Sequence, residues 1–286
     1  MKQVLLKSPD GARAKIFLQG AHLASWHPVA AEEQLFLSKT TEIGLGKALR
    51  GGVPIIFPQF ANRGALPKHG FARTAIWELI RHGRINDQQA QAVLQLNDNQ
   101  QTRAIWPHAF QANLIITLGG SDLKIALQIK NTDSTPFEFT SALHTYFAVE
   151  NITSASVHGL AGRAYLDSTN QQMMHAKHDP IQQHDGGLQI QGEIDRIYPS
   201  INQTTQTIEI RQSQQITKIQ QTGFTDLVLW NPGKSKAAEL TDLEPDGYQR
   251  FICVEAANAL QAHRLLPSEI WCGTQQVNIE RCDLKK

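Results

Sequence analysis

The sequence predicts a mainly β fold, a large antiparallel β-sandwich, on three observations. The commonest hydrophobic period is two, which sends successive side chains to opposite faces of a sheet. Two segments in the last quarter of the chain are continuously apolar, which is typical of strands covered on both faces. No segment carries the sustained apolar stripe at i, i+3, i+4 and i+7 that an amphipathic helix requires.

Each predicted element follows from its own residues. Residues 41–49 contain Gly44 and Gly46, each of which weakens a helix by about 1 kcal/mol relative to alanine, so we expect no helix there. Residues 123–130 are aliphatic at every odd position, as expected of a half-solvated antiparallel strand. The preceding Gly-Gly-Ser-Asp is turn-forming, so residues 113–118 should be the hairpin partner.

Three further strands are predicted in the second half of the chain. Residues 207–211 repeat the alternation, whereas residues 226–230 and 250–254 are each apolar without interruption after a first charged residue and are expected to be central strands. No linker, composition break or internal repeat divides the sequence. We therefore expect a single domain over residues 1–286.

Residues 174–192 are polar and predict a long loop. The loop contains His175, His178 and His184, and imidazoles within a short loop can converge on one ion. Their spacing lacks the tight pairs of known metal sites, and exposed loop histidines are common. We therefore expect no metal site.

The charge balance excludes several classes of partner. The chain of 286 residues has 27 Lys and Arg against 26 Asp and Glu, a formal net charge of +1. Nucleic acids and anionic membranes are bound through a marked excess of clustered basic residues, so we expect neither as a partner. No apolar run approaches the roughly 20 residues of a membrane helix. The amino terminus resembles no signal peptide, and three cysteines fit no disulfide framework, so we expect a cytoplasmic protein.

The common cofactor motifs are also missing. Residues 44–49 (GLGKAL) have leucine where the third glycine of a dinucleotide-binding turn should stand. The sequence contains no G-x-x-x-x-G-K-[ST], no H-E-x-x-H and no G-x-S-x-G. We therefore expect no cofactor.

Residues 49–60 (LRGGVPIIFPQF) and 66–73 (LPKHGFAR) are rich in glycine and proline, which fix an irregular backbone suited to hold side chains toward a ligand. The polar groups of these segments are Arg50, Lys68, His69 and Arg73. Two guanidiniums and an ammonium suit a dianionic phosphate, because the planar arginine fork pairs bidentately with its oxygens. The alternative is that Arg50 and Arg73 form surface ion pairs.

Six motifs follow one another along the chain: LRGGVP at 49–54, LPKHGFAR at 66–73, SALHTYF at 141–147, DRIY at 195–198, WNP at 230–232 and FICVE at 251–255. In kind and order they resemble the aldose 1-epimerase superfamily, and most closely its hexose-6-phosphate branch. Any one of these motifs is a weak signal. All six in sequence are specific and extend over nearly the whole chain.

The resemblance implies a galactose mutarotase-like β-supersandwich and the cofactor-independent interconversion of the α and β anomers of a hexose 6-phosphate. By position, His144 resembles the catalytic acid and Glu255 the catalytic base. Arg50 and Arg73 match the arginines that bind the substrate's phosphate in that branch. The other matches are Lys68 at a ligand-contacting position, His69 in the His-Gly motif and Asp195 at a position that holds sugar hydroxyls.

The residue types suit this chemistry. Anomer exchange needs a base for the O1 hydroxyl proton and an acid that protonates the ring oxygen O5. Glu255 ends an apolar run, so desolvation can raise its pKa, and the imidazole of His144 has the unperturbed pKa closest to neutrality. Structural roles stay open as alternatives: Glu255 could be neutralised by a neighbouring arginine, His144 could be a structural residue, and Asp195 could pair with Arg196.

Two positions depart from the resemblance. Gln59 and Ala61 stand where the branch often has Trp and Gly, which predicts a reshaped pocket wall and leaves the preferred hexose open. Two other functions stay open as well: a non-catalytic carbohydrate-binding β-sandwich, and a mutarotase for unphosphorylated aldoses in which Arg50 and Arg73 serve the fold. We expect a monomer whose ligand is a small sugar phosphate.

Overall fold

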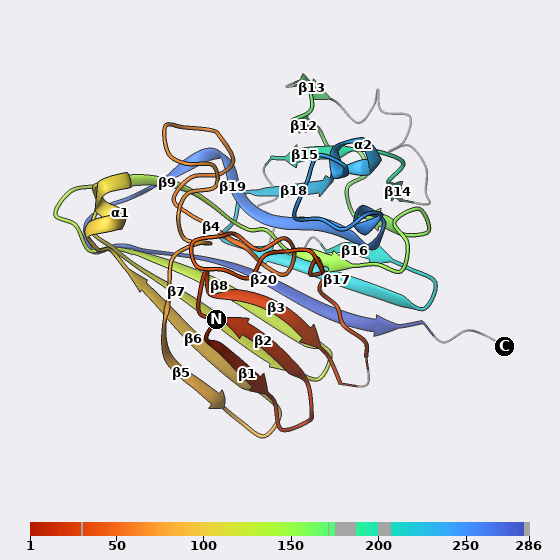
Figure 1. Cartoon of the computed structure of the whole chain (residues 1–286), viewed down its shortest axis with the longest axis horizontal. Helices are drawn as coiled ribbons and strands as arrows, with labels where there is room; N and C mark the ends of the chain where they lie inside the picture. The colour runs from red at the N-terminus through yellow and green to blue at the C-terminus, as the bar shows by residue number, and fades with distance from the viewer. Residues whose placement is uncertain (30, 171, 175–186, 200–206, 283–286) are drawn as a thin grey trace.

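The computed structural model describes residues 1–29, 31–170, 172–174, 187–199 and 207–282, which form three antiparallel sheets (Figure 1). The smallest sheet contains β1 (Gln3–Lys7), β2 (Arg13–Phe17) and β3 (His22–His27). The second sheet has the order β13 (Gln172–Met174), β12 (Tyr165–Asp167), β15 (Ile194–Tyr198), β18 (Asp226–Asn231), β19 (Phe251–Leu265), β9 (Phe137–Leu143) and β4 (Ile55–Ile56), and β10 (Tyr146–Ala148) pairs with β19. The third sheet has the order β14 (Leu188–Gln189), β11 (Ser156–His158), β16 (Ile208–Arg211), β17 (Gln215–Thr222), β20 (Ile270–Arg281), β8 (Asp122–Asn131), β7 (Phe110–Gly119), β6 (Ala90–Asn97) and β5 (Glu78–Arg84).

The predicted hairpin is confirmed. Strands β7 and β8 pair antiparallel, with Gly119 opposite Asp122 at the turn. The odd-numbered aliphatic residues of β8 are buried, because they point into the core while Lys124 faces solvent. The alternation expected at 207–211 is also present, as β16.

The two continuously apolar segments are central strands, as predicted. Strand β18 lies between β15 and β19, and β19 lies between β18 and β9, so both are covered by neighbours on each edge. The first nine residues of β19 are all buried. Strand β19 then continues through a register shift to Leu265, and β20 begins at Ile270, so these two consecutive strands connect the second sheet to the third.

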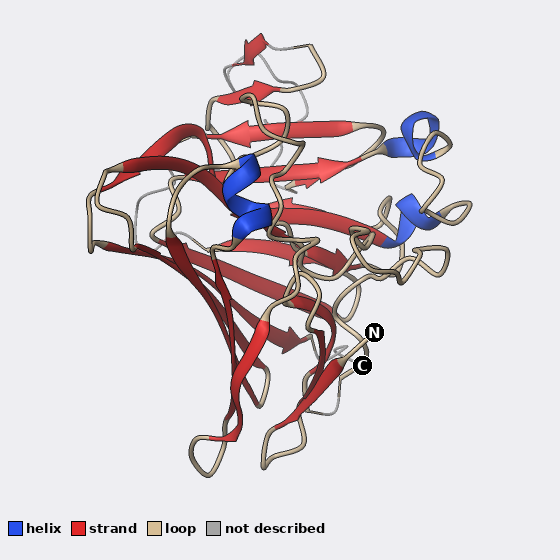
Figure 2. Ribbon diagram, turned by 60° about the vertical axis from the view of Figure 1, so that its left-hand side comes forward, coloured by secondary structure: helices blue, strands red, loops and turns tan. Residues whose placement is uncertain are grey.

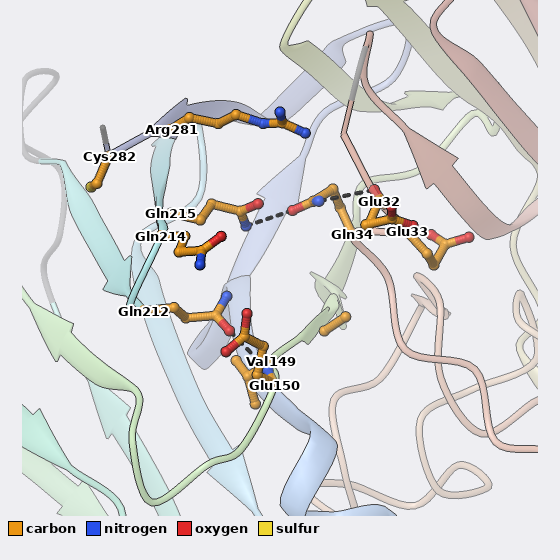
Figure 3. Close-up of a pocket in the computed structure, with 11 residues that line it drawn as sticks. Glu32, Glu33, Gln34, Val149, Glu150, Gln212, Gln214, Gln215, Arg281 and Cys282 are labelled. Atoms are coloured by element: carbon orange, nitrogen blue, oxygen red, sulfur yellow. Dashed lines mark hydrogen bonds between the residues drawn. The ribbon is translucent and has the colours of Figure 1, made fainter. Parts of the chain in front are cut away.

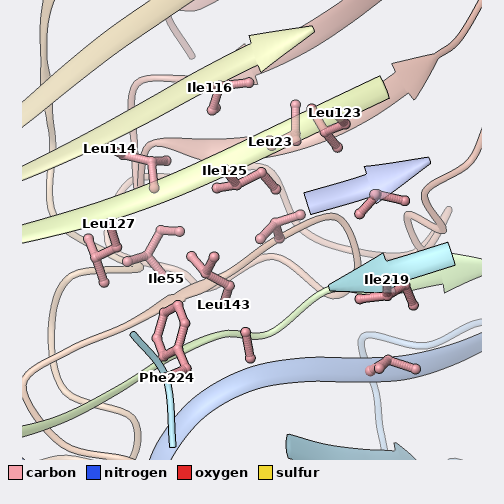
Figure 4. Close-up of a cluster of buried hydrophobic side chains, with 14 of the residues drawn as sticks. Leu23, Ile55, Leu114, Ile116, Leu123, Ile125, Leu127, Leu143, Ile219 and Phe224 are labelled. Carbon is pink, nitrogen blue, oxygen red and sulfur yellow. The ribbon is translucent and has the colours of Figure 1, made fainter. Parts of the chain in front are cut away.

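The main core fills the space between the sheets. Figure 4 shows Ile55 and Leu143 of the second sheet packed with Leu114, Leu127 and other aliphatic residues of the third. Leu23 of the smallest sheet joins the same cluster. The chain is therefore an antiparallel β-sandwich, the predicted fold class, with its short helices at the periphery (Figure 2).

The helical content is small but was not predicted. Helix α1 (Gln100–Ile105) begins with a capping box in which Asn99 and Thr102 exchange side-chain hydrogen bonds, a local signal that stabilises even a short helix. Helix α2 (Gly233–Ala237) and the 3₁₀ turn η2 (Gly247–Arg250) follow β18. Residues 41–49 contain no helix, as expected.

The polar stretch at 174–192 is described only in part. Residues 175–186, which include His175, His178 and His184, lie outside the described residues. Among the residues that are described, no group of three or more His, Cys, Asp or Glu side chains is arranged to hold a metal ion. The described helices are all too short or too polar to cross a membrane.

Candidate active site

The candidate site lies on the face of the second sheet that points away from the main core. Along β19, Val254 and Ala256 join that core, so the period of two sends Glu255 to the opposite face. Val228 is the cross-strand partner of Glu255, and Trp230 is the partner of Asp195. Adjacent strands thus bring Asp195, Trp230 and Glu255, which are far apart in the sequence, to one surface.

A cavity of about 430 Å³ opens over this surface. It is lined by Arg50, Phe60, Ala61, Asn62, Arg63, Lys68, His69, His144, Ser168, Asp195, Val228, Trp230, Lys236, Leu240 and Glu255. Six of the seven predicted site residues are therefore in one cavity. The seventh, Arg73, is not among the lining residues; its Nη2 donates to the carbonyl of Lys68, which does line the cavity, at 3.0 Å.

His144 and Glu255 face each other at the base of the cavity. Strand β9 ends at Leu143, and the amide of His144 then donates to the carbonyl of Pro54 at 3.0 Å. The imidazole Nε2 lies 3.3 Å from Oε1 of Glu255, and the two side chains are 11% and 2% exposed. Burial raises the pKa of the Glu255 carboxyl, and the charge of Asp195 raises it further. Burial and the charges of Arg50 and Arg73 lower the pKa of His144 to about 3.

His69 is held in the neutral form. The amide of Ala61 donates to its Nδ1 at 3.2 Å, and the amide of His69 donates back to the carbonyl of Ala61 at 3.0 Å. Burial is the main cause that lowers the pKa of His69, and His144 adds to the effect. Because Nδ1 accepts a hydrogen bond, the proton of the neutral ring is on Nε2.

The glycines of two motifs explain how these side chains are placed. Gly52 has φ of +59°, and a Cβ atom there would lie 2.3 Å from the carbonyl oxygen of Leu23. Gly70 has φ of +66°, and a Cβ atom would lie 2.2 Å from the carbonyl oxygen of Phe57. Only glycine permits these close approaches, so the Arg-Gly-Gly and His-Gly sequences fix where Arg50 and His69 enter the cavity.

One end of the cavity is basic. Arg50 Nε donates to Oδ1 of Asp242 at 3.2 Å, and Nη1 donates to the hydroxyl of Tyr146 at 3.2 Å. Burial together with the charges of Arg73 and Arg50 lowers the pKa of Lys68, and Lys236 of α2 contributes as well. Like charges gathered at one place favour an anion that would neutralise them.

Asp195 occupies another part of the cavity wall, on β15. Burial raises the pKa of its carboxyl, and a hydrogen bond from the side chain of Ser168 opposes this effect. Asp195 lines the cavity, and the guanidinium of its neighbour Arg196 lies over the ring of Tyr165, 4.2 Å from the ring centroid.

Gln59 and Ala61 take different places relative to the cavity. Gln59 does not line the cavity; its Nε2 donates to the carbonyls of Ala61 (3.2 Å) and Leu66 (2.8 Å) and its Oε1 accepts from the amide of Leu66 (2.9 Å). The buried side chain of Gln59 therefore holds the loop of residues 59–66 together through its backbone. Ala61 does line the cavity and has φ of +49°, in the left-handed region that favours glycine.

Several lining residues were missed by the sequence reasoning. Lys236 and Leu240 follow the Trp-Asn-Pro motif, and Trp230 belongs to it, but the sequence alone assigns this motif no role. Asn62 and Arg63 lie in the gap between two recognised motifs. A basic residue shortly after a motif was the only available signal, and it is weak.

A second and larger cavity, of about 650 Å³, contains none of the predicted site residues (Figure 3). Its walls are mainly Glu and Gln side chains, and several of these bind one another, as Gln215 does with Gln34 at 2.7 Å. Cavity size alone thus does not identify the site. The convergence of buried ionisable groups does.

Known proteins resemble this chain over nearly its whole length. The model of the aldose 1-epimerase family matches residues 2–278. The "Putative glucose-6-phosphate 1-epimerase" of Cenchrus ciliaris is 34% identical over 285 residues, 96% of this chain and 83% of its own. The protein of the same name from Escherichia coli K12 is 35% identical over 255 residues, 88% of this chain and 82% of its own. The solved structure of a "putative mutarotase (YeaD)" from Salmonella typhimurium superposes with a TM-score of 0.83 at 30% identity, over 95% of this chain and 88% of its own. The chain therefore belongs to the aldose 1-epimerase family and is an isomerase.

Proposed function

We propose that this protein interconverts the α and β anomers of a hexose 6-phosphate, with glucose 6-phosphate as the first substrate to test. The observation that carries the proposal is the contact between His144 and Glu255 in a cavity whose other end is basic. The names of the relatives from Cenchrus ciliaris and Escherichia coli support the same substrate.

Glu255 is the proposed base. It takes the proton from the O1 hydroxyl as the bond between C1 and O5 breaks, which opens the ring to the aldehyde. Its buried position strengthens the base, because a carboxyl whose pKa is raised holds a proton more tightly than an exposed one.

His144 is the proposed acid. It delivers a proton to O5 as the ring opens and takes it back as the ring closes. Rotation about the bond between C1 and C2 presents the other face of the aldehyde in between, so closure gives the other anomer. Two groups that lie side by side, one reaching the O1 hydroxyl and the other O5, suffice for both directions.

Arg50 and Lys68 are the proposed phosphate ligands, with Lys236 beside them on the same cavity. Arg73 adds a positive charge next to Lys68, because its Nη2 donates to the Lys68 carbonyl. The phosphate is on C6, the far end of the hexose from the reacting C1. These cations therefore anchor the sugar at one end while His144 and Glu255 act at the other.

Asp195 is the proposed ligand of the sugar hydroxyls, because one carboxylate accepts from two vicinal hydroxyls. His69 supports the same sugar through its Nε2–H, since its Nδ1 is already bound to Ala61. Trp230 offers an aromatic wall to the sugar ring.

We further propose that the whole chain acts as one domain, as a monomer, in the cytoplasm. The cavity is assembled from residues 50 to 255 of a single chain, which supports the single domain and needs no second copy. A phosphorylated sugar is charged and stays inside the cell that makes it. Size-exclusion chromatography with light scattering tests the monomer.

The deciding experiment is proton exchange spectroscopy between the α and β anomeric signals of glucose 6-phosphate, with and without protein, repeated on glucose. We expect faster exchange for the phosphate. If the protein accelerates anomer exchange of glucose alone, the acid–base mechanism stands, but the proposed phosphate ligands do not. No acceleration of either sugar, with binding retained, would indicate a carbohydrate-binding protein.

A further inference from the structure

Tyr146 joins the basic end of the cavity to the candidate acid. Its hydroxyl accepts from Nη1 of Arg50 at 3.2 Å, and its ring stacks on the imidazole of His144 with 4.9 Å between centroids and 10° between planes. The side chain is 2% exposed and does not line the cavity. Tyr146 thus touches one group from each end of the site without being able to touch the substrate.

The orientation of His144 depends on this stacking. Catalytic histidines are usually oriented by a hydrogen bond to the second ring nitrogen. Among the described residues, Nδ1 of His144 is buried and has no hydrogen-bond partner. The plane of the imidazole is set instead by its aromatic neighbours: Tyr146 stacks on one face, while Trp230 and His69 meet the ring edge to face at 5.9 and 5.8 Å.

Arg50 is held from two sides. Its Nε donates to Oδ1 of Asp242, and that oxygen also lies 3.1 Å from Nη2. On the other side, one N–H of Nη1 donates to the hydroxyl of Tyr146. Each terminal nitrogen carries two N–H groups, so Nη1 keeps a donor for an anion in the cavity. An anion that draws Arg50 toward itself pulls on the Tyr146 hydroxyl, and the rigid phenol ring passes that displacement to His144.

We propose that Tyr146 is a positioning residue that couples phosphate binding at Arg50 to the orientation of His144, so that the substrate's phosphate increases turnover in addition to affinity. The inference rests on the proposed function. It extends that function by assigning the phosphate a part in the chemical step, although C6 is remote from C1.

The charges around His144 also couple phosphate binding to the protonation of this imidazole. The groups that face it are Arg50, Arg73, Lys68, His69, Tyr146 and Glu255. The first three are cationic and help to lower the pKa of His144. A bound dianion offsets those charges, so the imidazole accepts the proton that it must deliver to O5 more readily.

Two variants of the groups that hold Arg50 separate coupling from simple binding. Tyr146→Phe keeps the aromatic stack and removes the hydroxyl, whereas Asp242→Asn changes the other side of Arg50 and leaves Tyr146 in place. Exchange spectroscopy over a range of glucose 6-phosphate concentrations gives kcat and KM for each. Tyr248→Phe is the matched control, because its hydroxyl accepts a hydrogen bond from the adjacent Gln249 and Tyr248 does not line the cavity.

We expect Tyr146→Phe to lower kcat by about tenfold or more, the loss typical of a hydrogen bond to a charged group, while Asp242→Asn mainly raises KM. Tyr248→Phe should match the wild type. A Tyr146→Phe protein that unfolds at the wild-type temperature yet keeps the wild-type kcat, or changes only in KM, overturns the proposal.

A second measurement needs no variant. Sulfate is a dianion too weakly basic to open the sugar ring by itself, and it should compete with glucose 6-phosphate. With glucose as the substrate, we expect sulfate to accelerate exchange in the presence of the protein. No acceleration at sulfate concentrations that inhibit glucose 6-phosphate exchange overturns the coupling alone, whereas a protein that never accelerates glucose 6-phosphate exchange loses the proposed function itself.

Discussion

The Nε2 atom of His144 lies 3.3 Å from Oε1 of Glu255, and no arginine of the described residues is within ion-pair distance of that carboxylate. The cross-strand partner of Glu255 is Val228, an apolar residue. This relationship decides between the two readings of Glu255: it is a buried acid facing an imidazole, and no arginine neutralises it. The first predictions follow from it.

Glu255→Gln should lower turnover of glucose 6-phosphate by about 100-fold or more, because an amide cannot take the O1 proton. The substitution keeps the size of the side chain, so the cavity should stay intact. Anomer exchange measured at saturating substrate gives the result, and thermal unfolding checks the fold. A folded variant with wild-type turnover would remove Glu255 from the mechanism.

His144→Ala should have a similar effect on turnover, about 100-fold or more, because O5 then lacks its proton donor. His108→Ala is a suitable control, since that imidazole is partly buried against Trp106 and lies off the cavity. Exchange rates of the two variants at equal protein concentration provide the comparison. Equal rates would assign the proton transfer to another group.

The dependence of kcat/KM on pH should show an acidic limb due to Glu255. The base acts only when ionised, and burial raises its pKa above the ordinary 4.5 of a glutamate. Activity should therefore fall as the pH decreases through that raised pKa, at a higher pH than for an exposed carboxylate. Exchange spectroscopy from pH 4 to pH 9 measures the limb; full activity down to about pH 4.5 would contradict the assignment.

Arg73→Ala should mainly raise KM, because phosphate binding is remote from C1 and Arg73 holds the backbone of Lys68, a proposed phosphate ligand. The expected change is about tenfold or more in KM with a smaller change in kcat. Arg81→Ala is the matched control, as that arginine is exposed on β5 and binds Gln91. A drop confined to kcat would place Arg73 in the chemical step.

The sequence predicted the strands well because period two is a local signal. The β7–β8 hairpin could be located from its aliphatic alternation and its Gly-Gly-Ser-Asp turn alone. The helix at 100–105 was not predicted, because its apolar stripe is too short to detect. A capping box of Asn99 and Thr102 stabilises this helix instead. Local patterns therefore predicted individual strands but not which strands lie next to one another in a sheet.

The composition of the site depended on the fold. Asp195 meets Trp230, and Val228 meets Glu255, only because β15, β18 and β19 are adjacent in the sheet. No periodicity in the sequence specifies that order. The family motifs supplied it indirectly, which is why six of the seven predicted residues line the cavity while Lys236, outside any motif, was missed.

Gln59 and Ala61 were expected together to reshape one wall of the pocket, and of these two residues Ala61 lines the cavity. Gln59 instead faces the inside of its own loop and is not part of the cavity wall. Its amide forms three hydrogen bonds within residues 59–66. Any influence on the sugar must therefore act through the loop that carries Lys68 and His69.

Gln59→Ala should lower the free energy of unfolding by about 2 kcal/mol, because three hydrogen bonds of a buried amide are lost and the amide of Leu66 is left without its acceptor. Since Ala61 and His69 bind each other across the same loop, KM for glucose 6-phosphate should rise as well. Urea unfolding and exchange spectroscopy measure the two effects, with Gln101→Ala on exposed α1 as the control. If stability falls while KM stays at the wild-type value, the loop holds its shape without Gln59, and the preference for one hexose must then be set by Ala61 and the other residues that line the cavity.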